Sequence, residues 1–116
     1  MLSKDEIRAR AKNRKTETIS VPEWDGDVTI QELSAGDRDH FEQVFASKDV
    51  TSHVRGLIVA KALIDPETKQ RLYSDAEASE ISEYGGAGVQ RIFEAIVSLS
   101  GMKAEKDKAL EEAAKN

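Results

Sequence analysis

Few side chains in this sequence could carry out chemistry, and their spacing is not that of a reaction centre. His40 and His53 lie on different predicted helices, thirteen residues apart, and no HxxxH or HxxE pairing reinforces them. A zinc site needs three or four converging ligands, so we interpret both as partly exposed histidines. The chain contains no cysteine, which excludes a thiolate metal site, a cysteine nucleophile and a disulfide framework.

Two glycine-containing stretches resemble binding loops only superficially. Residues 85–88 read Gly-Gly-Ala-Gly, but a helical pattern precedes them and the Lys-Ser/Thr of a phosphate loop is missing, so we predict a joint between helices. Asp25 and Asp27 flank Gly26 like half of a calcium loop, yet the glutamate that closes such a loop is absent and turn chemistry explains them. We therefore expect no enzymatic activity, no cofactor and no metal site.

The N-terminal residues 1–15 form a basic arm. They carry six Lys or Arg residues against two Asp or Glu, a local charge of +4, whereas the rest of the chain carries eleven against twenty, a charge of −9. Its candidate contact residues for a protein partner are Arg8, Arg10, Lys12 and Arg14. Two interpretations stay open: a solvated arm, or a handle for an acidic partner such as the body of another copy.

The single tryptophan, Trp24, stands beside a predicted hairpin turn, where burial is difficult. One interpretation is that the indole folds back over the hairpin and packs on the helices. The other is that Trp24 anchors a contact with a partner, since exposed tryptophan is a common binding hot spot.

Composition restricts the class of protein. At 116 residues the chain is expected to be one domain, and with only six aromatic residues its core must be mostly aliphatic. The net charge of −5 and the lack of a recognisable DNA-reading motif argue against nucleic-acid binding. No apolar run suits a membrane span or a signal peptide, so we expect no membrane association and a cytosolic protein.

The segment 16–33 predicts a β-hairpin. Ile19, Val21, Val28 and Ile30 alternate with polar residues and are expected on one face. With Asp25-Gly26 centred in the turn, Val21 would pair with Ile30. Because proline cannot donate to the ladder, we favour a four-residue loop, 24–27, with Pro22 at a non-hydrogen-bonded position.

Helical patterns account for most of the remaining chain. Capping boxes are predicted at Ser3 and Ser74, and a further helix start at Ser34. Residues 50–64 are expected to form a central buried helix, in which Gly56 marks a close helix crossing. The helix after Ser74 is expected to stop at 85–86, followed by an amphipathic helix carrying Val89, Ile92, Phe93 and Ile96 and ending near Gly101.

These elements predict an α+β fold: a mainly α-helical single domain with an N-terminal β-hairpin and a flexible C-terminal tail. We divide the chain into the basic arm (1–15), the α+β domain (16–101) and a charged, frayed or disordered tail (102–116).

Several stretches have a familiar order and spacing: LSKDEI (2–7), TETISVPEWDGDVTIQELSAGDRDHFE (16–42), RGLIVAKALID (55–65), RLYSDAEASEIS (71–82) and IFEAIVSLSG (92–101). The most specific part is Val21-Pro22-Glu23-Trp24, followed by Gly26 and by Glu32-Leu33-Ser34 ahead of a helix. In these features the chain resembles the tail assembly chaperones of long-tailed, non-contractile bacteriophages.

That resemblance implies a non-enzymatic role without a cofactor. Members of the family bind the tape measure protein, keep it soluble, help to recruit tail-tube subunits, act in the host bacterial cytoplasm and are absent from the mature virion. The basic arm and acidic body add an expectation of self-association. Two alternatives stay open: a minor structural component of the tail, or a nucleic-acid-associated adaptor that uses the arm.

The resemblance also implies a longer form made by ribosomal frameshifting. The final residues Ala114-Lys115-Asn116 can be encoded by GCA AAA AAC, which contains a slippery heptamer. The codons of the gene decide whether such a site exists there.

Overall fold

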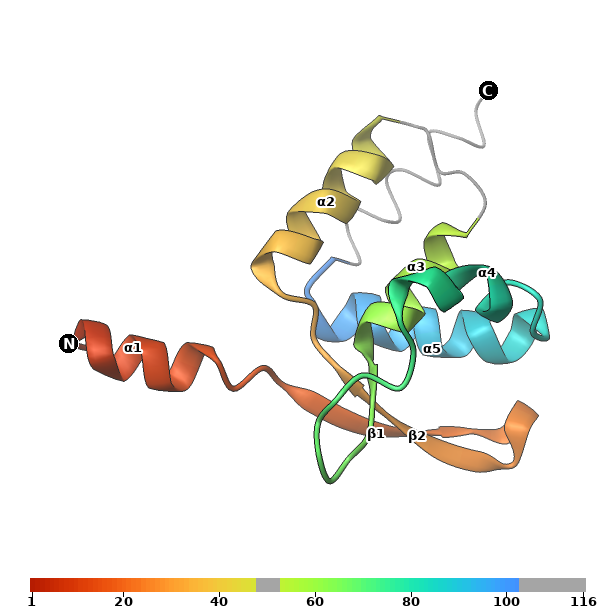
Figure 1. The fold of residues 1–116 in the computed structure, drawn as a ribbon, viewed down its shortest axis with the longest axis horizontal. Coiled ribbons are helices and arrows are strands. Elements are labelled where there is room, and N and C mark those ends of the chain that lie inside the picture. The colour runs from red at the N-terminus through yellow and green to blue at the C-terminus, as the bar shows by residue number, and fades with distance from the viewer. Residues whose placement is uncertain (48–52, 103–116) are drawn as a thin grey trace.

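The computed structural model of the chain describes residues 1–47 and 53–102, and its helices and strands form one body from which the first helix projects (Figure 1). In chain order the elements are α1 (Lys4–Ala11), β1 (Thr16–Val21), the 3-10 turn η1 (Pro22–Trp24), β2 (Gly26–Gln31), α2 (Ala35–Ala46), α3 (Val54–Ala62), β3 (Leu63–Ile64), the 3-10 turn η2 (Asp75–Glu77), α4 (Ala78–Ile81) and α5 (Gly86–Leu99). The predicted α+β class, mainly helical with an N-terminal hairpin, is confirmed.

Helix α1 stands apart from the body of the protein. Its predicted capping box is present: the Glu6 backbone N–H donates to Ser3 Oγ at 3.2 Å, and Glu6 Oε1 accepts from the Ser3 N–H at 3.2 Å. No residue of α1 is buried. The helix extends away from the hairpin (Figure 1), and the contacts that support it within the described residues are its local caps and ion pairs.

The hairpin forms as predicted, but the predicted register is wrong. Val21 pairs with Gly26 and Ile19 with Val28, so the connecting residues are 22–25 rather than 24–27. Pro22 opens the 3-10 turn η1, where its fixed φ suits the first helical position, and Asp25 closes the turn in the left-handed region with φ 51°. The real register differs from the predicted one by an even number of residues, so the side chains keep their faces. Val21 and Ile30 are fully buried, and Ile19 and Val28 pack against the same core.

The central helix ends two residues earlier than predicted. Leu63 has extended backbone angles, φ −80° and ψ 119°, and strand β3 pairs antiparallel with β2, giving the sheet order β1-β2-β3. The helix begins at Val54, and the first three residues of the predicted range 50–64 lie outside the described residues. The helical periodicity of that range could not reveal the early end, because Leu63 and Ile64 are buried and would be so in either conformation. By pairing with Leu63 and Ile64, β2 satisfies backbone hydrogen-bonding groups on the edge that faces away from β1.

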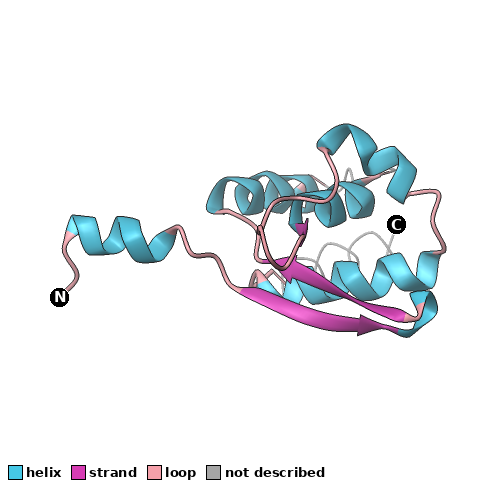
Figure 2. Cartoon of the chain, turned by 60° about the horizontal axis from the view of Figure 1, so that its bottom comes forward, coloured by secondary structure: helices cyan, strands magenta, loops and turns pink. Residues whose placement is uncertain are grey.

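The hairpin lies along α5, and α3 packs on both α5 and α4 (Figure 2). Ser34 is the N-cap of helix α2, and its Oγ accepts from the Asp37 N–H at 3.1 Å. The core between these elements is aliphatic apart from three phenylalanines. Its fully or nearly fully buried members include Phe41, Phe45, Ile58, Val59, Ile81, Ile92, Phe93, Ile96 and Val97.

Gly56 marks the predicted close crossing. A Cβ at this position would lie 2.4 Å from the carbonyl oxygen of Ala78 and 2.8 Å from Ser82 Oγ, so only glycine allows α3 to approach α4 this closely. The segment after Ser74 differs from the prediction. The Ser74 N–H donates to Glu77 Oε1 at 2.8 Å as expected for a capping box, but the 3-10 turn η2 and a single turn of α4 replace the longer helix.

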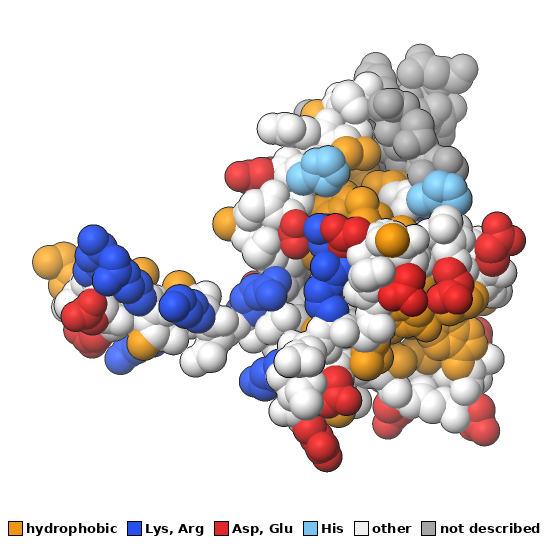
Figure 3. Space-filling model, in the orientation of Figure 1, with side chains coloured by type: hydrophobic (Ala, Val, Ile, Leu, Met, Phe, Trp, Pro, Cys, Tyr) orange, Lys and Arg blue, Asp and Glu red, His pale blue; other side chains and the backbone are white. Residues whose placement is uncertain are grey.

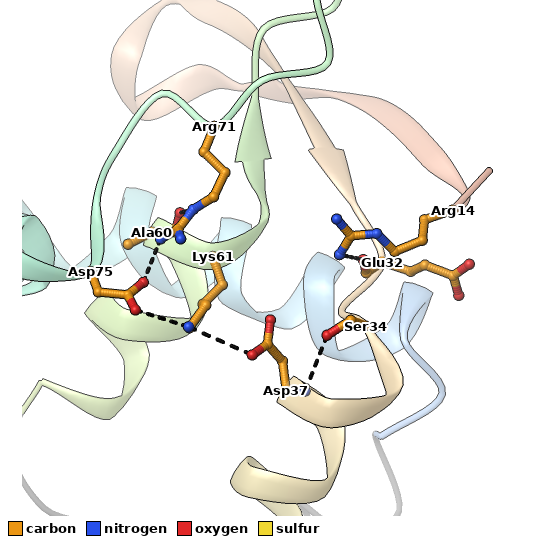
Figure 4. A network of polar contacts seen from close by, with 8 residues as sticks. All are labelled: Arg14, Glu32, Ser34, Asp37, Ala60, Lys61, Arg71 and Asp75. Atoms are coloured by element: carbon orange, nitrogen blue, oxygen red, sulfur yellow. Dashed lines mark hydrogen bonds and ion pairs between the residues drawn. The ribbon is translucent and has the colours of Figure 1, made fainter. Parts of the chain in front are cut away.

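Lys61 ties the segment 71–77 to the helices. From the last turn of α3 its Nζ lies 2.9 Å from Asp75 and 3.6 Å from Asp37 (Figure 4). Arg71 approaches Asp75 at 2.6 Å and also donates to the carbonyl oxygen of Ala60 at 3.0 Å. Hydrogen bonds from Lys61 first, and then from Arg71, hold the pKa of Asp75 below its ordinary value.

The C-terminal end of α5 closes the core. Gly101 adopts φ +74°, as expected for the residue that ends a helix. Met102, assigned above to the tail, is fully buried. Residues 103–116 of the predicted tail lie outside the described residues, as do Lys48 to Ser52.

Candidate protein-interaction surfaces

The hairpin tip is clamped onto the first half of α5. Arg91 of α5 makes a two-pronged ion pair with Glu23, its Nε and Nη2 donating to the two carboxylate oxygens at 2.8 and 3.0 Å. The hydrogen bond from Arg91 is the main cause that lowers the pKa of Glu23. Because Glu23 sits in η1, this pair holds the turn, and with it Trp24, against the helix.

Trp24 packs on a glycine. A Cβ at Gly88 would lie 2.7 Å from the indole Nε1 and 2.8 Å from Cε2, so the missing side chain creates the space that the ring uses. The indole is still 40% exposed. Of the two interpretations of Trp24, the fold-back onto the helices is confirmed. The partner contact stays a prediction, since a large part of the ring faces outward.

Trp24 belongs to a chain of aromatic contacts that we name the aromatic patch: Trp24, Tyr73 and Tyr84. The Trp24 and Tyr84 rings meet edge to face with centroids 6.1 Å apart, and the Tyr84 and Tyr73 centroids are 6.4 Å apart. The two tyrosine hydroxyls lie 3.1 Å from each other. The patch thus gathers every Trp and Tyr of the chain at one surface, whereas the phenylalanines are buried. That division is expected, because indole and phenol have a polar end that favours a wet boundary.

Acidic side chains accompany the aromatic patch. Tyr84 donates a hydrogen bond to Glu80 at 3.1 Å, and hydrogen bonding to Tyr73 first, together with burial and Glu80, raises the pKa of Tyr84. Asp25 follows Trp24 and Glu83 precedes Tyr84, and both are exposed. We name Asp25, Glu80 and Glu83 the acidic rim. Figure 3 shows acidic side chains above and below the apolar surface on the right of the body.

A small hollow opens next to Tyr84. It has a volume of about 280 Å³ and lies between the start of α3, α4 and the first turns of α5. Its lining includes His53, Ile81, Ser82, Tyr84, Val89 and Gln90. The aromatic patch and this hollow together offer rings and an indentation to a bulky apolar side chain.

The basic arm is at the other end of the hairpin. Arg8 and Arg10 make only loose ion pairs, at 3.6 Å to Asp5 and 3.8 Å to Glu6. Of the arm residues proposed above as contacts, Arg8, Arg10 and Lys12 are exposed, whereas Arg14 is half-buried. The sequence-predicted site residues therefore do not converge: Trp24 is at the hairpin tip, and the cationic residues are beyond the opposite end of the strands (Figure 1).

Arg14 fixes the base of the arm. Its guanidinium donates to the carbonyl oxygen of Glu32 at 3.3 Å (Figure 4). The Glu32 carboxylate in turn accepts from the Lys15 N–H at 3.0 Å. Beside this joint lies a hollow of about 540 Å³ that includes Lys12, Ser34 and Arg38 in its lining. The joint explains why the arm leaves the body in a defined direction.

The remaining candidates from the sequence have structural explanations. His53 Nδ1 lies 2.9 Å from Ser82 Oγ, and the His40 ring stands edge to face on Phe41. Within residues 1–47 and 53–102, no three His, Asp or Glu side chains are grouped so that they could hold a metal ion. In the same part of the chain no helix is long and apolar enough to cross a membrane. The prediction that residues 85–88 form the joint between helices is largely wrong: residues 82–85 connect α4 to α5, and Gly86, Ala87 and Gly88 already form the first turn of α5.

Sequence reasoning missed Tyr73, Tyr84 and Gly88. Gly88 was read only as part of a joint, and its role depends on an indole 64 positions earlier in the chain. One signal was available: Trp and Tyr are the aromatics that favour a wet boundary, and this chain has three of them.

The chain is similar to known proteins in both sequence and fold. The sequence profile of the family described as phage tail assembly chaperone matches residues 3–116. The solved structure of the bacteriophage HK97 tail assembly chaperone is similar in fold, with a TM-score of 0.59 and 22% identity, covering 80% of this chain and 92% of that one. Among curated protein sequences no match is found. The match of the family profile over nearly the whole length shows that this chain belongs to the phage tail assembly chaperone family.

Proposed function

We propose that this protein binds the tape measure protein during tail assembly, keeps it soluble and helps to recruit tail-tube subunits. The observation that carries the proposal is the family match over residues 3–116. In this role the protein acts in the host cytoplasm and leaves the assembling tail before the virion is complete. Catalysis has no part in the role.

The described surface supports a binding role. Large apolar side chains are exposed on the body at Trp24, Leu72 and Tyr84 and on the arm at Leu2 and Ile7. A tape measure segment with an apolar stripe would dock such a stripe against exposed apolar side chains. Many copies along one long client would give avidity even where each contact is weak.

Co-expression with the tape measure protein of the same phage tests the proposal. We expect the tape measure protein to be soluble and to co-purify with this chain, and to aggregate without it. An equally soluble tape measure protein in the absence of this chain would contradict the chaperone role.

Mass spectrometry of purified virions tests the departure of the protein. We expect none of its peptides in mature particles. Stoichiometric recovery would favour the alternative of a minor structural component. The nucleic-acid alternative predicts DNA binding that weakens steeply with salt, and we expect none at physiological salt.

A further inference from the structure

Trp24 is exposed and at the same time fixed in place. The Glu23–Arg91 ion pair holds the turn against α5, with contacts of 2.8 and 3.0 Å, and Gly88 leaves the space in which the ring sits. The tryptophan nevertheless keeps 40% of its surface exposed. A ring that is already immobilised loses little conformational entropy when a partner covers it. Trp24 is therefore prepared for a contact outside its own chain.

Tyr84 and the hollow beside it continue this surface. The Tyr84 hydroxyl lies 3.1 Å from the Tyr73 hydroxyl and 3.1 Å from the Glu80 carboxylate, so the ring is also held in place. The hollow, of about 280 Å³, is smaller than the about 300–1,000 Å³ of a small-molecule site. Two buried apolar residues, Ile81 and Val89, contribute to its lining. The hollow therefore suits one apolar side chain of a larger partner rather than a separate ligand.

The acidic rim gives the patch an excess of negative charge. Its three carboxylates are on exposed residues, whereas the two arginines nearby are already engaged. Arg91 is paired with Glu23, and the Arg55 guanidinium lies over the ring of Phe93, 5.5 Å from its centre. An acidic partner would be repelled, and an uncharged partner would leave the carboxylates unmatched. Charge complementarity therefore favours a cationic partner.

A helix with an apolar stripe fits the spacing of these features. Residues three or four apart on one helix face have Cβ atoms about 5–6 Å apart, close to the 6.1 Å between the ring centres of Trp24 and Tyr84. One apolar residue of such a helix can cover a ring while the next enters the hollow. Lysine and arginine beside the stripe then meet the acidic rim, and arginine also binds favourably over an aromatic face.

We infer that the aromatic patch is the client site of this protein, and that it selects helical segments in which an apolar stripe is flanked by Lys or Arg. The inference rests on the proposed function, since it takes these segments to belong to the tape measure protein. It adds which surface holds the client and which segments of the client are held. A segment with the same apolar stripe but acidic flanks is bound more weakly.

Two synthetic helical peptides test the selectivity of the patch in the full chain. Both have about 18 residues, enough for a helix to form, and the same stripe of leucines. One carries lysine and the other glutamate at the remaining positions. Neither contains tryptophan, so the emission of Trp24, the only tryptophan of this chain, reports binding at the patch. We expect the lysine peptide to bind at least about tenfold more tightly, as several exposed charge pairs together imply, and to bind more weakly as salt is added.

A charge reversal tests the role of the acidic rim. The rim variant is Glu80→Lys with Glu83→Lys. The control, Glu17→Lys with Glu67→Lys, makes the same change in net charge at two exposed positions away from the patch. Circular dichroism first verifies that each variant is folded. The control should keep the wild-type preference for the lysine peptide, whereas the rim variant should prefer the glutamate peptide. The inference is overturned if the wild type binds both peptides equally, or if the rim variant keeps the wild-type preference.

Co-purification with overlapping fragments of the tape measure protein tests the identity of the client. We expect the wild type and the control to retain fragments whose apolar stripe is flanked by Lys or Arg, and the rim variant to bind them at least about tenfold more weakly. Equal binding by the wild type and the rim variant overturns the inference and leaves the proposed function standing. If the wild type binds the lysine peptide but no fragment, the proposed function fails, and the client assignment fails with it. A rim variant that differs from the wild type only in self-association would assign the patch to a second copy and also overturn the inference.

Discussion

Replacing Gly88 by alanine moves Trp24 without altering the indole itself. The added methyl group would lie 2.7 Å from Nε1 and 2.8 Å from Cε2. Ordinary contacts between such atoms are about 3.5–4.0 Å, so the ring must move outward by about 1 Å. The exposed side of the indole leaves room for that movement, because 40% of the residue already faces solvent.

The expected change in stability is small because two terms oppose each other. Alanine stabilises a helix by up to about 1 kcal/mol relative to glycine, with the full value reached at interior positions, and Gly88 lies in the first turn of α5. A tryptophan buries up to about 250 Å², of which about 150 Å² is covered here. Losing a third of that area costs about 1.2 kcal/mol at about 25 cal/mol per Å². We therefore expect Gly88→Ala to remain within about 1 kcal/mol of the wild type.

Gly56→Ala is the matched control. It makes the same change inside a helix, but the obstacle is the carbonyl oxygen of Ala78 at 2.4 Å, which cannot move unless α3 and α4 separate. Overpacking costs about 1–3 kcal/mol, and the helix gain offsets about 1 kcal/mol. From the upper end of that range we expect a loss of about 2 kcal/mol, or about 10 °C in Tm.

Thermal unfolding followed by circular dichroism gives the two stabilities, and Trp24 emission reports the position of the ring. Gly88→Ala should shift the emission toward that of a more exposed indole with little change in Tm. The reasoning fails if Gly88→Ala destabilises the protein as much as Gly56→Ala, or if the emission of Trp24 is unchanged.

Two further substitutions examine the clamp at the hairpin tip. Trp24→Ala should lower the free energy of unfolding by about 2–3 kcal/mol, less than the about 3–5 kcal/mol expected for a fully buried aromatic residue. Urea unfolding measures this change, and an unchanged stability would mean that the indole does not pack on α5. Arg91→Gln should lower Tm at neutral pH. Arg91 holds the folded-state pKa of Glu23 below its ordinary value of 4.5, so the pair's contribution is complete above that value and is lost as the pH falls through the lowered pKa. The Tm difference from the wild type should therefore vanish in acid, and a difference that is constant with pH would contradict this origin.

Local chemistry explains what could be predicted from the sequence. Some features depend only on residues close together in the sequence, so their pattern can be recognised without the fold. These features are the capping serines Ser3 and Ser34, the apolar face of the hairpin strands and the apolar stripe of α5. The glycine at 56 was also recognisable as a helix crossing, because glycine inside a buried helix has a cost that close packing offsets. The resemblance to the family rested on the order and spacing of such stretches along the chain, and the profile match over residues 3–116 shows the membership.

Other features depended on contacts between distant residues. The hairpin register was mispredicted because the turn could begin at Pro22 or later, and only the 3-10 turn held by the Glu23–Arg91 pair selects the former. Leu63 and Ile64 became a strand because the edge of β2 lies beside them.

The aromatic patch is the clearest case of a feature that the sequence alone could not reveal. Trp24, Tyr73 and Tyr84 come from three separate segments, and they meet because Gly88 leaves space for the indole on α5. The composition and spacing of the chain determined its caps, its stripes and the charge of its arm. Tertiary packing decided which exposed rings share a surface, because that depends on the space between elements rather than on any period along the chain.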